Sequence, residues 1–238
     1  MRLPYLNRVE AGQVLADALR AGYAGRENLL VLGLPRGGVP VAYEVAEELQ
    51  AALDMLLVRK LGVPGREELA FGALALGGVR VLNDDVVTGL GLPDEVIDAV
   101  TQREAAELQR RERAYRDDRP PPQITGRCVI VIDDGLATGA TMRAGVAVLR
   151  QQAPEQVVVA VPVAPPETVL ALEEEADHVV CPATPEPFYG VGRWYEDFTQ
   201  TTDDEVRALL ARAWARSGRA SGTSDYAPSG GRAPPEHS

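Results

Sequence analysis

The chain has few of the residues that build most metal sites and nucleophilic triads. Its 238 residues include two histidines, two cysteines and one lysine, Lys60, so arginine supplies 23 of the 24 basic residues. With only His178 and His237 available, the chain lacks the residues for a zinc site of the Cys/His kind and for a Ser-His-Asp mechanism. Cys128 and Cys181 each lie in an apolar run, which indicates buried thiols in a reducing compartment and not a disulfide framework.

Positive charge and long apolar runs are also scarce. Asp and Glu number 35, and the net charge of -11 argues against the broad basic surface that non-specific nucleic-acid binding requires. No apolar run approaches the roughly 18 residues of a membrane span, and the opening MRLPYLNRVEAG has no apolar signal-peptide core. We therefore expect a cytoplasmic protein that binds neither nucleic acid nor a membrane.

Short apolar runs alternate with amphipathic segments over most of the chain. Helices are predicted at residues 9–23, 39–53, 93–116, 141–152, 165–176 and 201–216, and strands at 29–34, 55–61, 128–132, 157–163 and 179–181. Two further extended segments, 69–76 and 79–82, are joined by Gly77-Gly78 and indicate a hairpin. Unbroken apolar strands between helices predict an α/β fold, a mostly parallel sheet with helices on both faces.

The composition divides the chain into one domain and a tail. Residues 1–216 carry the predicted elements, whereas residues 217–238 are rich in Gly, Ser, Pro and Ala and have almost no large apolar residue. Such a segment buries too little surface to offset its ordering entropy. We predict a single domain over residues 1–216, followed by a disordered tail over residues 217–238.

Two polar features of the middle of the chain have structural explanations. Asn83-Asp84-Asp85 could bind a cation, but a turn or a helix cap is the simpler interpretation. The pairs Glu107–Arg111 and Glu112–Arg116 stand four residues apart, which favours an exposed, solvated helix face over an interaction patch.

The segment CVIVIDDGLATGATM, residues 128–142, carries the clearest chemical signal. The adjacent carboxylates Asp133 and Asp134 follow a buried strand, and a loop of small residues then leads into a helix. Ligands bind outside the carboxyl ends of parallel strands, and a small-residue loop before a helix presents N–H groups to an anion. The loop therefore suits a phosphate, and the carboxylates suit vicinal hydroxyls, a divalent cation, or both.

This segment resembles the signature of the type I phosphoribosyltransferases, which bind phosphoribosyl pyrophosphate (PRPP). That signature has four apolar residues, two acidic residues, a few small residues and then Thr-Gly-x-Thr. The resemblance implies that Asp133 and Asp134 hold the ribose, and that they bind Mg²⁺ directly or through ribose hydroxyls or water. It implies a 5-phosphate site made by Gly135, Ala137, Thr138, Gly139, Ala140 and Thr141.

The resemblance extends upstream. Family members have a pyrophosphate loop after their first core strand, and Arg36, Gly37 and Gly38 stand there in this chain. An ordinary strand-to-helix turn is the alternative. Arg59 and Lys60 would end the second parallel strand at the same edge and meet pyrophosphate or substrate, or else form a surface pair. The family's mobile loop would lie within residues 62–73 of this chain.

The acceptor side is less defined. Family members have a variable hood after the last core strand, here within about residues 180–200 together with the N-terminus. Phe188 and Tyr189 could stack on a planar base, or pack the segment onto the core. Ala137 stands where 6-oxopurine-type members carry an aspartate, so a 6-oxopurine acceptor loses support, although Glu67 and Glu68 remain in the probable loop.

The resemblance implies an enzyme, a phosphoribosyltransferase that moves the phosphoribosyl group of PRPP to a nitrogen acceptor and releases pyrophosphate. Arg36, Lys60, Asp133 and Asp134 would be its catalytic residues, Mg²⁺ its cofactor and a homodimer its assembly. A non-enzymatic regulatory protein that binds PRPP or a nucleotide with the same fold is the alternative.

Overall fold

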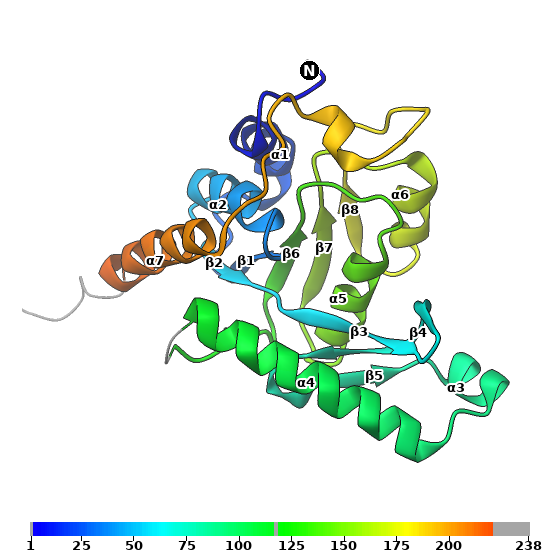
Figure 1. Cartoon of the computed structure of the whole chain (residues 1–238). Helices are drawn as coiled ribbons and strands as arrows, with labels where there is room; N and C mark the ends of the chain where they lie inside the picture. Colours follow the sequence, from blue (N-terminus) through cyan, green and yellow to red (C-terminus); the bar gives the residue numbers. More distant parts are fainter. Residues whose placement is uncertain (1, 117–118, 221–238) are drawn as a thin grey trace, which may run out of the picture.

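A five-stranded parallel sheet forms the centre of the protein (Figure 1). The computed structural model describes residues 2–116 and 119–220. The strand order is β2-β1-β6-β7-β8, and every neighbouring pair is parallel. The strands are β1 (Leu29–Gly33), β2 (Ala52–Met55), β6 (Cys128–Ile132), β7 (Gln156–Ala160) and β8 (His178–Val180). This arrangement confirms the predicted α/β class.

Helices cover both faces of this sheet, as predicted. The helices on one face are α1 (Arg8–Tyr23) and α2 (Gly38–Glu48), and those on the other are α5 (Ala140–Arg150) and α6 (Pro166–Glu173). Alternate residues of each central strand enter one hydrophobic cluster or the other, for example Ile130 on the α1 side and Val131 on the α5 side. Because both faces are covered, β1 and β6 are buried at every position, which explains their unbroken apolar sequences.

A second, antiparallel sheet lies beside the first. Its order is β3-β4-β5, with β3 (Val58–Val63), β4 (Arg66–Ala75) and β5 (Arg80–Leu82), and a 3₁₀ turn, η1 (Leu76–Gly78), closes the predicted hairpin. The helices α3 (Asp84–Leu90) and α4 (Asp94–Arg116) follow. Asn83 caps α3 by accepting a hydrogen bond from the Val86 N–H, so the cap interpretation is confirmed.

Two sequence predictions around residue 50 are wrong. The helix expected at 39–53 ends at Glu48, because Gln50 adopts a left-handed conformation (φ 53°) and the Ala51 N–H returns to the Ala46 carbonyl. The strand expected at 55–61 is two strands in different sheets, β2 and β3. Arg59 and Lys60 therefore lie within antiparallel β3 and do not end a strand of the parallel sheet.

The chain's last described helix is α7 (Asp203–Ala220). Thr202 and Glu205 cap it reciprocally, each side chain accepting a hydrogen bond from the other's backbone N–H. Residues 217–220, which we expected in the tail, continue this helix, because no proline interrupts its backbone hydrogen bonds there. The rest of the predicted tail, 221–238, lies outside the described residues. In the described part of the chain, no helix is both long and apolar enough to cross a membrane.

The two ends of the domain meet above the parallel sheet. Tyr5 forms a parallel bridge with Tyr195, next to the 3₁₀ turn η2 (Val191–Trp194), and the two rings lie 5.7 Å apart. Tyr5 is fully buried and donates from its hydroxyl to the Pro162 carbonyl. The N-terminal segment and residues 188–198 thus form one small cluster, which we call the hood (Figure 1).

Candidate functional site

The adjacent carboxylates Asp133 and Asp134 are at the centre of the candidate site. They follow β6 directly, at the carboxyl edge of the parallel sheet, and both are half-buried. The Asp134 backbone N–H donates to Asp133 Oδ1 at 2.9 Å. Burial raises the pKa of both carboxyl groups, and the neighbouring Asp134 charge raises that of Asp133 further. Removing two carboxylates from water is costly, so a cation placed beside them would favour their ionised forms.

An arginine from the first helix supplies part of that charge. Arg8 Nε donates to Asp134 Oδ2 at 2.8 Å, and both side chains are only about one-eighth exposed. The Arg8 guanidinium also donates to the Thr199 carbonyl and stacks 4.2 Å above the Phe198 ring. Sequence analysis missed Arg8, because no local pattern distinguishes it from the other 22 arginines.

The loop that follows the carboxylates is shaped for an anion. Gly135 and Gly139 have φ values of 156° and 68°, which residues with a Cβ rarely adopt. The Thr168 hydroxyl donates to the Ala137 carbonyl at 2.6 Å, which fixes the middle of the loop. The loop then enters α5, whose N-cap, Gly139, has no side chain and whose first turn has no acidic residue. Unsatisfied N–H groups and the helix dipole therefore favour an anion at this point.

The remaining predicted phosphate ligands lie on the same loop. Ala137 and Thr138 are exposed, Ala140 is the first residue of α5, and Thr141 follows with an exposed side chain. The structure thus brings the 135–141 segment together with both carboxylates at one edge of the sheet.

The loop at residues 35–38 lies directly against the carboxylates. A Cβ on Gly37 would overlap the Asp134 carboxylate, and a Cβ on Gly38 would lie 2.6 Å from the Ile132 carbonyl oxygen. Both glycines are therefore required by close packing between the two loops. Gly37 is also the N-cap of α2, which has no side-chain cap and no acidic residue in its first turn. The first N–H groups of α2 are already paired, that of Gly38 with the Leu34 carbonyl and that of Val39 with the Arg36 carbonyl, and Pro40 has none.

Arg36 points away from the carboxylate pair. It faces an acidic residue, Asp203, the first residue of α7, with an N–O distance of 3.7 Å. Arg36 lines a separate polar cavity beside α4, at the outer side of the 35–38 loop.

Arg59 and Lys60 occupy different surroundings from those predicted. Arg59 donates to Glu104 of α4 at 2.7 Å. Lys60 lines a cavity of about 460 Å³ between the antiparallel sheet and α5, together with Ala140 and Arg143. Of these two residues, Lys60 is nearer the phosphate loop, because Ala140 lines the Lys60 cavity and is also part of the 135–141 segment.

The two aromatic candidates of the hood also differ in their surroundings. Phe188 packs against Trp194, with ring centroids 6.2 Å apart, whereas Tyr189 is 79% exposed. Tyr195 is the aromatic residue nearest the carboxylates, and its hydroxyl donates to the Asp134 carbonyl at 2.5 Å. Burial raises the Tyr195 pKa, so this hydroxyl is a stable donor that ties the hood to the site.

The fit of Asp133 and Asp134 to a divalent cation depends on oxygens from a bound ligand. Within residues 2–116 and 119–220, no three Asp, Glu, His or Cys side chains form a group that could hold a metal ion. Mg²⁺ is commonly bound by one or two carboxylates together with substrate phosphates. Asp133 and Asp134 therefore fit Mg²⁺ when ligand oxygens complete its coordination.

Known structures and sequences agree with this architecture. The crystal structure of the Thermus thermophilus protein TT1426 is 43% identical, covers 89% of this chain and 99% of its own, and superposes with a TM-score of 0.81. The Bifunctional protein PyrR of Chloroflexus aurantiacus is 31% identical over 111 residues, which are 46% of this chain and 55% of that protein.

Two curated proteins from Mycobacterium tuberculosis strains are more similar in sequence. Each carries the name "Putative phosphoribosyl transferase". Each is 53% identical over 207 residues, which are 87% of this chain and 46% of the relative. The chain thus spans about half the length of these relatives. The family model described as "Phosphoribosyl transferase domain" matches residues 7–191. The match includes both site loops, and the chain belongs to the phosphoribosyl transferase domain family.

Proposed function

We propose that this protein is a phosphoribosyltransferase that transfers the 5-phosphoribosyl group from PRPP to a nitrogen acceptor and releases pyrophosphate. One observation carries the proposal: Asp133 and Asp134 lie beside the uncapped start of α5 and against the glycine loop at residues 35–38. A carboxylate pair beside an anion site matches the hydroxyls and the phosphate of a phosphorylated sugar. The acceptor is a nucleobase or a related amine.

The carboxylates would act on the ribose. As the bond to pyrophosphate breaks, positive charge develops on the sugar, and fixed negative charge nearby stabilises it. Asp133 and Asp134 would accept hydrogen bonds from the vicinal hydroxyls and orient the ring. Mg²⁺, bound with the substrate, would neutralise charge on the leaving pyrophosphate.

The backbone would hold the two ends of PRPP. The 135–141 loop and the start of α5 would bind the 5-phosphate, and the 35–38 loop, whose glycines pack against the carboxylates, would lie against the diphosphate. Lys60, whose cavity borders Ala140, would add positive charge to the first of these sites. Catalysis would come from positioning and electrostatics, without a covalent intermediate on the protein.

The test is release of pyrophosphate from PRPP and Mg²⁺ across a panel of purines, pyrimidines and simple amines. We expect turnover with at least one acceptor, and its loss in Asp133→Asn/Asp134→Asn. The matched control is Asp84→Asn/Asp85→Asn, an exposed adjacent pair at the start of α3. Unchanged PRPP binding in the Asp133/Asp134 variant would refute the site assignment.

The Arg8–Asp134 ion pair supports a second candidate, a regulatory protein that binds PRPP or a nucleotide without turnover. An arginine already engages one ribose-binding carboxylate, and a regulatory site could use that contact to report occupancy. Binding of PRPP without pyrophosphate release for every acceptor would favour this candidate. For either function we propose a homodimer, which light scattering of the full chain would test.

A further inference from the structure

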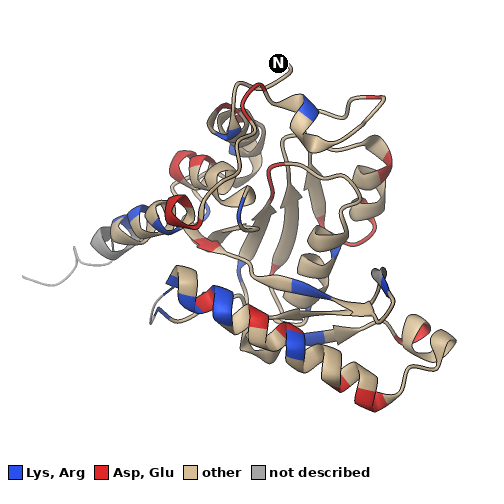
Figure 2. Cartoon of the chain, in the orientation of Figure 1, with Lys and Arg blue, Asp and Glu red and all other residues tan. Residues whose placement is uncertain are grey.

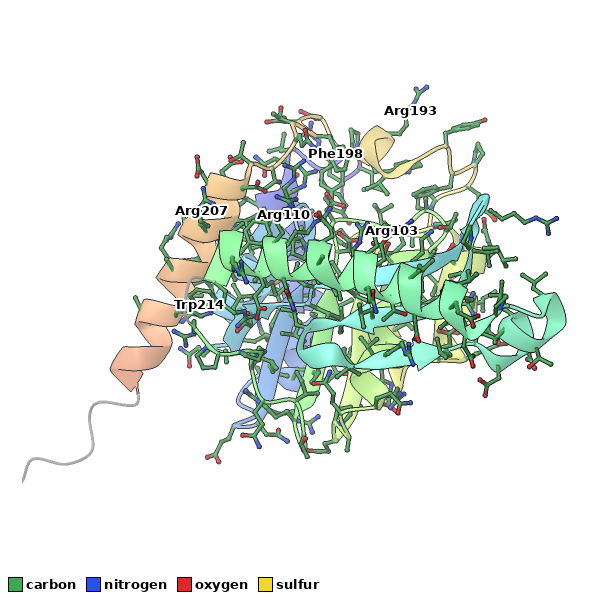
Figure 3. The ribbon with its side chains drawn as sticks, turned by 60° about the horizontal axis from the view of Figure 1, so that its bottom comes forward. Arg103, Arg110, Arg193, Phe198, Arg207 and Trp214 are labelled. Atoms are coloured by element: carbon green, nitrogen blue, oxygen red, sulfur yellow. The ribbon has the colours of Figure 1, made fainter. Side chains whose placement is uncertain are left out.

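One guanidinium group, that of Arg8, connects the hood with the carboxylate pair. Its Nε donates to Asp134 Oδ2 at 2.8 Å, and its Nη1 donates to the Thr199 carbonyl at 2.8 Å. The central carbon of the guanidinium lies 4.2 Å from the centre of the Phe198 ring. Figure 3 shows Phe198 on the segment that leads from η2, where Arg193 lies, to α7. A movement of this segment would therefore reach Asp134 through Arg8.

The fold fixes the start of the helix that carries Arg8. Arg8 is the first residue of α1, and the preceding Asn7 caps this helix by accepting hydrogen bonds from the Val9 and Glu10 N–H groups. In Figure 2 the acidic turn after β6 is red at the carboxyl end of that strand, and α1 lies above the same edge of the sheet. The Arg8 side chain therefore extends to the carboxylates from a fixed point of the backbone.

Each carboxylate of the pair has one oxygen held by a donor of the protein. Asp133 Oδ1 accepts a hydrogen bond from the Asp134 N–H at 2.9 Å, and Asp134 Oδ2 accepts one from Arg8. The bond to Arg8 is charge-assisted, and the Arg8 and Asp134 side chains are only 12% and 13% exposed. A carboxylate is planar, so holding one oxygen restricts its rotation. The Arg8 bond thus sets the direction of the second Asp134 oxygen.

The positive charge of Arg8 also bears on how a cation meets this edge of the sheet. Two adjacent carboxylates repel each other, and a positive group beside them relieves the repulsion. Arg8 supplies such a charge at Asp134 before any ligand binds. A divalent cation that bound the pair by itself would have to share Asp134 with the guanidinium. A cation that arrives with phosphate oxygens needs fewer protein ligands and loses less from this competition.

We infer that Arg8 is the positioning residue of the carboxylate pair: it orients Asp134 for the ribose hydroxyls and, as a built-in cation, keeps free Mg²⁺ from the pair. The inference rests on the proposed function only for the identity of the ligand, PRPP with Mg²⁺. Arg8 acts through Asp134, and Phe198 and Thr199 orient Arg8. The hood therefore also determines how the sugar is held.

The first test measures the binding of Mg²⁺ alone, by calorimetry at pH ~9 to limit competition from protons. Arg8→Met keeps an unbranched side chain but removes its charge, so we expect Mg²⁺ to bind at least tenfold more tightly than in the wild type. Loss of structure does not produce such a gain, and Asp134→Asn in the Arg8→Met background should abolish it. The matched control is Arg20→Met, which removes an exposed arginine of the same helix from its pair with Asp17 and should change the affinity less than twofold.

The second test measures PRPP affinity at saturating Mg²⁺. We expect Arg8→Met to weaken PRPP binding at least tenfold, as is typical of residues that orient ligand-binding side chains. Arg8→Lys restores the charge but not the fork of donors that serves both Asp134 and Thr199. It should return the Mg²⁺ affinity to within about threefold of the wild type and recover only part of the PRPP affinity. This variant also decides the matter if Arg8→Met does not fold, because wild-type PRPP affinity in Arg8→Lys would overturn the positioning role.

Phe198 tests the route from the hood. Phe198→Leu keeps an apolar side chain but removes the ring against the guanidinium, so PRPP affinity should fall about threefold in the wild-type background. If Phe198 acts through Arg8, the same change should have little further effect in Arg8→Met, because residues in contact are not additive. Equal losses in the two backgrounds would refute this route.

The two proposals fail separately. If the wild-type protein binds no PRPP, yet Arg8→Met binds Mg²⁺ more tightly than Arg20→Met does, the proposed function fails and the built-in cation stands. If the wild type and Arg8→Met bind and turn over PRPP equally, and their Mg²⁺ affinities are the same, the role of Arg8 is overturned and the function stands. A loss of PRPP affinity without a change in Mg²⁺ affinity overturns the built-in cation and supports positioning.

Discussion

At the scale of single residues, the site depends on the absence of a side chain as much as on charged groups. Gly37 lies so close to Asp134 that any Cβ would overlap its carboxylate. The Asp134 side chain is also bound by Arg8, so a shift away from position 37 would disturb this ion pair. The residue type at position 37 is therefore set by the approach of two loops and not by a turn.

Gly37→Ala should reduce PRPP affinity at least tenfold, because the new methyl group displaces the Asp134 carboxylate. Overpacking of this kind also destabilises a fold by about 1–3 kcal/mol. The control is Gly22→Ala in α1, where a Cβ meets no atom within 4 Å. That change should raise stability by up to about 1 kcal/mol and leave PRPP binding unaltered. Calorimetric titration with PRPP and thermal unfolding measure both effects; equal PRPP affinities in the two variants would contradict the expectation.

At the scale of elements, a mostly buried carboxylate contributes to the contact between α4 and the antiparallel sheet. Glu104 is 7% exposed and accepts hydrogen bonds from Arg59 of β3 and from Arg103. Burial alone would raise the Glu104 pKa, but the two arginines outweigh it and the pKa is lowered. The ionised side chain therefore stabilises the contact between α4 and β3.

The sign of the pH dependence follows from this lowered pKa. The stabilisation by Glu104 is present above the ordinary glutamate pKa and is lost as the pH falls through the lowered value. Glu104→Gln should cost about 2 kcal/mol of unfolding free energy at pH 7, and this difference should shrink toward zero below pH ~3. Urea unfolding at pH 7 and at pH ~3 tests it, with Glu112→Gln on the same helix as a control expected to stay within about 0.5 kcal/mol. A Glu104 difference that grew on acidification would refute this account.

Local chemistry explains which elements the sequence predicts. Residues 128–141 were assigned correctly as strand, loop and helix, because the apolar run, the two carboxylates and the glycines are contiguous. The change from β2 to β3 was missed, because the run from Met55 to Leu61 contains no turn residue. Of the two spaced pairs on α4, Glu107–Arg111 forms, whereas the Arg116 side chain is buried and binds Asp54. Such long-range partners leave no local pattern.

At the scale of the whole molecule, one buried ion pair connects the parallel sheet with two outer helices. Arg116, the last residue of α4, donates to both oxygens of Asp54 in β2, at 2.6 and 2.9 Å. Both residues are less than 5% exposed, and the Arg116 guanidinium lies 6.0 Å from the Trp214 ring of α7. The ends of α4 and α7 are thereby fixed on the edge strand.

Removing one partner of this pair leaves a buried charge without its counterion. Asp54→Ala should lower the unfolding free energy by about 3–5 kcal/mol, whereas Asp98→Ala, which loses an exposed pair with Arg80, should cost only about 0–1 kcal/mol. The double variant Asp54→Leu/Arg116→Leu should lose less than Asp54→Ala, because no charge remains buried. Denaturant unfolding measures all three, and a double variant less stable than Asp54→Ala would show that the pair contributes more than its charge balance.

The bridge between Tyr5 and Tyr195 has a consequence for synthesis of the protein on the ribosome. The first helix is made early, and the central strands can pair once β6 and β7 have emerged. The hood segment that carries Tyr195, and with it the hydroxyl that donates to the Asp134 carbonyl, leaves the exit tunnel after the five parallel strands and both site loops. Tyr5 and Arg8 therefore gain their hood partners only after residues 195–199 have been synthesised, later than both site loops.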